Sequence, residues 1–379
     1  MKKIIPYGRQ FIDQQDIISV TQSLMKDKIT TGLLVDKFEK EINKYLKCKY
    51  SVTCNSGTSS IYLALQSIQL KKNDIIIMPS INFIASYNIA KLFGAKVYVA
   101  DVNSESGQMR PEDVINCCKK FKLKKIKALI LMYHGGYPEN AEKFRKFRKK
   151  LGCYIIEDAC HAFGSEYRIN KINYKVGSCK HSDISTFSFH AVKSITTGEG
   201  GVVTTNSKKI YNKIKELRSI GIKRNFKHWD YDVVEYGLNF RLSDIQCALG
   251  ISQLKKINLF LNKRKEIALK YKKDLKEIKN ISLINHQPKY KSSYHLFFLK
   301  INNFNLKKKE NFIKFMLNKK ILLQYHYIPI YKFKIFKDKY YGANANKFYN
   351  TTISLPIYYS LKKKEHNYII HSIKNFFNR

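Results

Sequence analysis

The stretch IKALILMYHGGYPENAEKFRKFRKKLGCYIIED, residues 126–158, decides the fold class of this chain. It begins with a continuous apolar run (126–132), passes through a basic helical pattern that stops at Gly152, and ends in a second apolar run (153–157). Continuous apolar runs of this length are typical of strands buried on both faces, and a glycine commonly ends a helix. The stretch therefore predicts a strand, a helix and a second strand in succession.

The same alternation extends over residues 55–205. Further strands are predicted at 74–78, 96–100, 184–189 and 202–205, and further helices at 56–70 and from residue 110, where Pro111 suits a first helical turn. Alternating strands and helices predict an α/β fold with a mostly parallel sheet covered by helices. Ligands of such sheets bind at the carboxyl ends of the strands.

The remainder of the chain predicts a smaller α+β unit. A helical tract covers 242–278, and after it come a strand-like YHLFFLKI (294–301), a helix near 308–320, ISLP (353–356) and a C-terminal helix. We expect a large domain at 1–250 and a small domain at 251–379.

The charge balance raises a different class of function. The chain has 70 Lys and Arg against 29 Asp and Glu, a formal net charge of +41, which is compatible with nucleic-acid binding. The positive residues are spread along the whole sequence, however, and no RNP-type motif, zinc finger or isolated basic tail accompanies them. Nucleic-acid binding is kept as an alternative of another class. Our main expectation is that there is no nucleic-acid partner and that the charge favours anionic small ligands.

The sequence also predicts the cellular compartment of the protein and whether it has a metal site. The N-terminal MKKIIPYG lacks an apolar stretch of signal length, and the longest apolar region, 75–90, is interrupted by Pro79, Ser80 and Asn82. Eight cysteines occur without CxxC spacing and are interpreted as reduced thiols. We expect a cytoplasmic protein with no membrane partner and no metal site.

Three pieces of sequence carry candidate chemistry. NSGTSS (55–60) opens a helix after a strand-like segment, so its amides and hydroxyls could bind a phosphate or could simply cap the helix. Asp158 follows an apolar run, where it could pair with a ring nitrogen or cap the next turn, and His161 could be an ordinary buried histidine. Lys193 stands in FSFHAVKSITTGEGG (187–201); a partly desolvated amine there would be nucleophilic, whereas a solvated loop lysine would not. Together the three provide what pyridoxal phosphate needs, namely an amine, a carboxylate and a helix N-terminus.

The chain resembles the DegT/DnrJ/EryC1/StrS sugar aminotransferases over nearly its full length. The likeness rests on EDACHAFGS (157–165), FSFHAVKSITTGEGG and GLNFRLSDIQCALGISQLKK (237–256). It implies a fold type I, aspartate aminotransferase-like enzyme that uses pyridoxal 5'-phosphate. Through YHYIPIY (325–331) and ISLP, the chain is most similar to members that act at C4 in pseudaminic acid biosynthesis. The implied reaction moves an amino group from glutamate to a UDP-linked 4-keto-6-deoxy-N-acetylamino sugar; another nucleotide 4-keto sugar is the alternative.

The resemblance also implies roles for particular residues. Lys193 would bind the cofactor aldehyde and transfer protons, Asp158 would hold the pyridine nitrogen, and His161 would lie near the 3-oxygen. The other implied cofactor contacts are Phe83 against the ring, with Gly57, Thr58, Ser188 and Asn239 at the phosphate. Asn239 would come from a neighbouring subunit, which implies a homodimer with shared active sites. The implied nucleotide-sugar contacts are Tyr7, Asp27, Lys28, Ile29, Thr30, Tyr325, His326 and Tyr327.

Local alternatives exist for several of these residues. Phe83 and Tyr7 could be core aromatics, and Ser188 and Asn239 could satisfy nearby backbone groups. For Arg241 the sequence leaves open a contact with the donor carboxylate, with the sugar pyrophosphate or with an acid at an interface.

Overall fold

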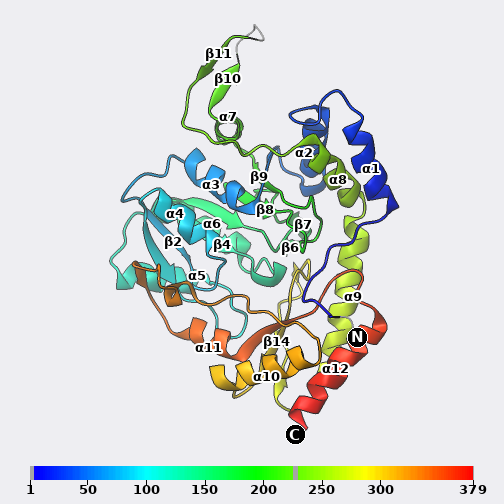
Figure 1. Cartoon of the computed structure of the whole chain (residues 1–379). Coiled ribbons are helices and arrows are strands. Elements are labelled where there is room, and N and C mark those ends of the chain that lie inside the picture. Colours follow the sequence, from blue (N-terminus) through cyan, green and yellow to red (C-terminus); the bar gives the residue numbers. More distant parts are fainter. Residues whose placement is uncertain (1–3, 225–228, 379) are drawn as a thin grey trace.

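The largest element of the computed structural model, which describes residues 4–224 and 229–378, is an eight-stranded sheet (Figure 1). Its strands, in spatial order, are β1 (Tyr50–Cys54), β9 (Gly201–Thr205), β8 (Ile184–Ser188), β5 (Tyr154–Asp158), β4 (Ala128–Met132), β2 (Ile75–Pro79), β3 (Lys96–Ala100) and β15 (Lys339–Tyr340). All neighbours pair in parallel except β9, which is antiparallel to both β1 and β8. The predicted α/β class and mostly parallel sheet are confirmed.

Helices cover both faces of this sheet, which explains why a central strand such as β4 is apolar throughout. In β4 the side chain of Ile130 joins one core, and Leu129 and Leu131 join another. The first core is covered by α3 (Gly57–Ser67), α4 (Ala85–Leu92) and α7 (Lys208–Arg218). The opposite cores are covered by α2 (Leu33–Leu46), α5 (Pro111–Lys120), α6 (Ala141–Leu151) and α8 (Asp244–Lys255).

The C-terminal part packs helices on a small antiparallel sheet. The sheet consists of β12 (Ile281–Ser282), β14 (Phe297–Ile301) and β16 (Thr352–Leu355), and the helices are α9 (Ile257–Leu275), α10 (Leu306–Asn318), α11 (Asn344–Thr351) and α12 (Lys363–Phe377). The helical tract predicted over 242–278 consists of two helices, α8 and α9, separated at Lys256. The predicted domain boundary at 250/251 falls within α8 and stays a prediction.

Smaller elements complete the chain. They are α1 (Gln14–Leu24), the short 3₁₀ helices η1 (His134–Gly136) and η2 (Ile330–Lys332), a sheet of β13 (Tyr290–Lys291), β6 (Glu166–Ile169) and β7 (Ile172–Lys175), and the hairpin of β10 (Ile222–Arg224) and β11 (Tyr231–Val233). The hairpin projects away from the body (Figure 1). Within the described ranges, no helix has both the length and the apolar character to cross a membrane.

Candidate active site

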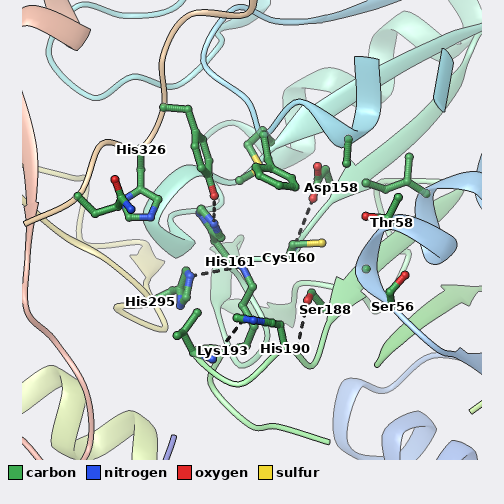
Figure 2. Close-up of a pocket in the computed structure, with 18 of the residues that line it drawn as sticks. Ser56, Thr58, Asp158, Cys160, His161, Ser188, His190, Lys193, His295 and His326 are labelled. Atoms are coloured by element: carbon green, nitrogen blue, oxygen red, sulfur yellow. Dashed lines mark hydrogen bonds between the residues drawn. The ribbon is translucent and has the colours of Figure 1, made fainter. Parts of the chain in front are cut away.

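A cavity of about 500 Å³ opens at the carboxyl edge of the large sheet (Figure 2). Asp158 is the last residue of β5, Ser188 is the last residue of β8, and the first turn of α3 borders the same space. Lys193 enters it from the loop after β8. The parallel topology thus brings together three segments that are far apart in the sequence.

Lys193 directs its amine into this cavity. A turn holds its backbone, with the Lys193 N–H donating to the His190 carbonyl at 2.9 Å. The Nζ atom lies 3.5 Å from Nε2 of His295. Burial lowers the pKa of this amine, against the opposing effect of Cys160 and Asp158. The environment is that of a desolvated amine and differs from that of a solvated loop lysine.

Asp158 is a buried carboxylate with neutral partners only. It is 3% exposed; its Oδ2 accepts from the Ser86 hydroxyl at 3.1 Å and its Oδ1 from the Cys160 N–H at 3.3 Å. No described Lys, Arg or His lies within ion-pair distance of it. Burial raises its pKa, although these hydrogen bonds act in the opposite direction. Asp158 does support the following turn, as one of the two sequence interpretations proposed, and still presents a carboxylate to the cavity.

The beginning of α3 forms a close-packed cradle beside Ser188. Ser56 caps the helix by accepting from the Ser59 N–H at 3.0 Å. A Cβ on Gly57 would lie 2.7 Å from Cβ of Ser188, and a Cβ on Gly201 would lie 2.3 Å from the Ser56 carbonyl oxygen. Glycine is therefore required at both positions for the loops to approach. The first amides of a helix lack intrahelical acceptors, so this end of the cavity is suited to an anion.

A histidine and a tyrosine line the opposite wall. Nδ1 of His161 accepts from the Gly135 N–H at 3.4 Å, and its Nε2 lies 2.8 Å from the Tyr327 hydroxyl. Burial, followed by the charge of Lys193, holds the His161 pKa well below its ordinary value. The ring is therefore neutral, its Nε2–H donates to Tyr327, and the Tyr327 hydroxyl keeps a hydrogen for the cavity. The Phe83 ring, half exposed, lies 5.6 Å from the Tyr327 ring.

Most of the predicted site residues share this cavity; five do not, and Arg241, whose role the sequence left open, also lies outside it. The residues that line it are Tyr7, Gly57, Thr58, Phe83, Asp158, His161, Ser188, Lys193, Tyr325, His326 and Tyr327. The segment Asp27, Lys28, Ile29 and Thr30 is exposed beside α8, where Thr30 bridges to Ser243. Asn239 is exposed and bridges to Ser219, and Arg241 borders a separate basic hollow. The roles of the residues outside the cavity stay predictions.

Several contributors were missed by sequence reasoning. Ser86 orients Asp158, and its signal was its place three residues after Phe83, a predicted site residue. His295 contacts Lys193, yet YHLFFLKI was interpreted only as a strand. Cys160, His190 and Glu199 also line the cavity and lie inside motifs quoted above.

Comparison with known proteins agrees with this geometry. Residues 10–374 match the DegT/DnrJ/EryC1/StrS aminotransferase family, so the chain belongs to that family. A UDP-4-amino-4,6-dideoxy-N-acetyl-beta-L-altrosamine transaminase from Campylobacter jejuni is 36% identical over 377 residues, covering 97% of this chain and 96% of the relative.

Two solved structures define the fold relationship further. The Helicobacter pylori structure described as PseC, an aminotransferase involved in the biosynthesis of pseudoaminic acid, has a TM-score of 0.91 at 31% identity and covers 99% of this chain and 100% of its own. The PLP form of the putative sugar aminotransferase Spr1654 from Streptococcus pneumoniae has a TM-score of 0.87 at 24% identity, with 99% of both chains covered, and shares the fold.

Proposed function

We propose that this aminotransferase uses pyridoxal 5'-phosphate to move an amino group from glutamate to C4 of a UDP-linked 4-keto-6-deoxy-N-acetylamino sugar. The observation that carries the proposal is the common cavity of Lys193, Asp158 and the α3 N-terminus. A cytoplasmic location is part of the proposal.

The residues present fit the cofactor. Asp158 is a buried acid that lacks a cation among the described residues, and a protonated pyridine nitrogen would supply one. The missing Cβ at Gly57 lets Ser188 pack close to the first turn of α3, so the free amides of that turn and the Ser188 hydroxyl can face one phosphate. Asp158 would hold the ring nitrogen, Phe83 and His161 would contact the ring and its 3-oxygen, and Gly57, Thr58 and Ser188 would hold the phosphate. When bound, the group supplies an aldehyde for the amine of Lys193 and a ring that withdraws electrons from the substrate carbon.

The chain's own residues then have separable tasks. Lys193, whose pKa burial lowers, provides an amine that loses its proton more readily than an exposed lysine and can carry a proton between two neighbouring atoms. Asp158 supplies a fixed negative charge that Ser86 and the Cys160 N–H hold in place. Tyr327, held by His161, presents a hydroxyl to the cavity.

The substrate assignment rests on the family relatives and on the cavity entrance. Relatives at 36% and 34% identity are named as transaminases of the UDP-altrosamine series. Tyr7, Tyr325 and His326 form a polar aromatic side of the cavity, and the Tyr7 and His326 rings lie 5.5 Å apart. Such groups can stack on a sugar ring and donate hydrogen bonds to its hydroxyls.

The proposal includes a homodimer. Asn239 lies outside the cavity of its own chain, which fits a residue that serves a second copy. Large apolar side chains are exposed on and after the β10–β11 hairpin, including Tyr231, Val233, Tyr236 and Leu238. A second copy that covers them would remove this apolar surface from water.

The test is a substrate panel. Purified protein with cofactor is incubated with glutamate and a set of UDP- and GDP-linked 4-keto sugars, and 2-oxoglutarate and the amino sugar are quantified. We expect turnover with the UDP-linked N-acetylamino substrate. Lys193→Ala should abolish turnover and the lysine adduct detected by mass spectrometry after borohydride reduction, whereas Lys276→Ala at the exposed end of α9 should retain both. An adduct of wild-type size in Lys193→Ala would refute the lysine assignment.

A further inference from the structure

Arg264, on α9, is a buried cation with no acidic partner. The residue is 3% exposed, and within the described ranges no carboxylate lies at ion-pair distance from it. Among the residues that the structure describes, its guanidinium donates only to backbone carbonyls, those of Ile357 at 2.9 Å, Tyr294 at 3.3 Å, His295 at 3.3 Å and Val192 at 3.5 Å. Buried arginines are usually paired with acids, so this arrangement calls for an explanation.

The carbonyls that Arg264 binds belong to the segments that hold the reactive amine. Val192 immediately precedes Lys193, and the Val192 carbonyl is part of the peptide bond that joins the two residues. His295 carries the ring whose Nε2 lies 3.5 Å from Nζ of Lys193. Ile357 follows β16 in the C-terminal part of the chain. The planar Arg264 guanidinium therefore hydrogen-bonds to the segments on both sides of the Lys193–His295 contact. A lysine ammonium at this position could not bind both segments equally well.

We propose that Arg264 is a positioning residue for Lys193: it fixes the Val192 and His295 carbonyls, and with them the two segments whose side chains meet at the Lys193–His295 contact, and its positive charge disfavours protonation of the amine. The inference rests on the proposed catalytic role of Lys193 and deepens it. It assigns this role to a side chain that does not line the main cavity.

The charges around the amine have opposing effects. The titratable and charged groups that face Lys193 from neighbouring segments are Asp158, Cys160, His161, His295, His326 and Arg264. Asp158 and Cys160 raise the pKa of Lys193, whereas burial, the largest cause, and Arg264 lower it. Burial lowers the pKa of Arg264 to about 10, so the guanidinium remains charged at neutral pH.

The His295 ring, which faces the Lys193 amine, is uncharged. Burial, followed by the charges of Lys193 and Arg264, holds the His295 pKa well below its ordinary value. Its ring is therefore neutral, and its Nε2 can accept a hydrogen bond from the Lys193 amine. Arg264 thus favours the uncharged form of the two side chains that face each other.

The experiment measures Lys193 directly, without cofactor or substrate. Cofactor-free protein is trace-labelled with acetic anhydride, which reacts with uncharged amines, from about pH 6 to about pH 11, a range that brackets the ordinary lysine pKa. Labelling of the Lys193 peptide is quantified by mass spectrometry relative to exposed Lys276. Arg264→Gln keeps an amide donor and removes the charge, and Arg264→Met removes both.

We expect both variants to raise the midpoint of Lys193 labelling by about one pH unit, because a neighbouring like charge has been removed. Arg218→Met is the matched control: Arg218 is also buried but is paired with Glu39, so this variant should lose stability and leave the Lys193 profile unchanged. A folded Arg264→Gln protein, shown by near-UV circular dichroism and a cooperative melt, with an unchanged midpoint would overturn the proposal. If neither variant folds, a wild-type midpoint at or above 10.5 would overturn it as well.

The outcome is separable from that of the proposed function. Labelling requires neither transamination nor the cofactor adduct, so Arg264 can control the amine even if the substrate panel fails. Equally, an active enzyme whose Lys193 profile ignores Arg264 would retain the proposed function and lose this inference.

Discussion

Asp158 provides the first prediction at the scale of single residues. Asp158→Asn keeps the shape and can keep both contacts, with its Oδ1 accepting from the Cys160 N–H and its amide NH2 donating to the Ser86 hydroxyl, but it removes the negative charge that faces the cavity. We expect cofactor binding to persist and the rate of amino transfer to fall by about 10²-fold or more, because fixed charge at the ring nitrogen stabilises the transition state. Single-turnover kinetics with glutamate and a separate cofactor titration measure the two effects.

Ser86→Ala is the graded control for that prediction. It leaves the carboxylate in place and removes one neutral hydrogen bond, worth about 1 kcal/mol or roughly fivefold in rate. A rate loss in Ser86→Ala as large as that in Asp158→Asn would show that orientation, and not charge, accounts for the effect of Asp158.

The sequence predicts the key residues of the site unevenly. Lys193 and Asp158 each follow a strand that the apolar pattern identifies, so their location at the carboxyl edge follows from parallel topology. The structure ends β5 at Asp158, one residue later than the apolar pattern suggested. Arg264 and His295 lie about 70 and 100 positions beyond Lys193, and only tertiary packing brings them to it. No local pattern carries that information.

At the scale of elements, the entry into α3 controls the anion cradle. In Gly57→Ala the new Cβ would meet Cβ of Ser188 at 2.7 Å, so the first turn of α3 or the end of β8 must move. We expect a destabilisation of about 1–3 kcal/mol and a matching loss of affinity for pyridoxal phosphate, because overpacking displaces the amides that face the phosphate. Equilibrium titration of the cofactor-free protein and a urea melt provide the measurements.

Gly152→Ala is its matched control. Gly152 ends α6 with φ +63, and a Cβ there would meet no atom within 4 Å. The left-handed conformation should cost about 1–2 kcal/mol of stability and leave cofactor affinity unchanged. If Gly152→Ala weakened the cofactor as much as Gly57→Ala, the loss would reflect general destabilisation and the cradle assignment would fail.

The elements themselves show where pattern reading succeeds and where it fails. Buried strands such as β4 are continuously apolar because both faces are covered, which makes them readable from the sequence. The break between α8 and α9 is not readable, since neither glycine nor proline marks it. Lys256 at that break forms ion pairs with Asp13 and Asp16 near α1, so a contact across about 240 positions accompanies the bend.

At the scale of the whole molecule, one cavity combines distant parts of the chain. Tyr7 comes from the N-terminal segment, His295 from the strand region of the small sheet, and Tyr325 and His326 from the segment before η2. The N-terminal segment also pairs with the C-terminal part through Ile5 and Ile321. The sequence predicts the α/β part and the C-terminal α+β part. How these two parts pack against each other depends on long-range contacts such as these.

The homodimer proposal predicts that two variants, each inactive alone, restore activity when their subunits are mixed. If Asn239 serves the cavity of the partner, Lys193→Ala and Asn239→Ala subunits should each be inactive alone and complement each other when mixed. A mixed dimer would contain one cavity with both defects and one with neither. With random exchange, half of the dimers are mixed, so activity should recover to roughly one quarter of the wild-type value. Subunits are exchanged in mild urea, the dimer is verified by light scattering, and 2-oxoglutarate formation is measured.

A Lys193→Ala and Asp158→Asn mixture is the control: both residues line the cavity of one chain, so every cavity in a mixed dimer remains defective. Equal recovery in the two mixtures would contradict the shared site, as would a monomer at working concentration.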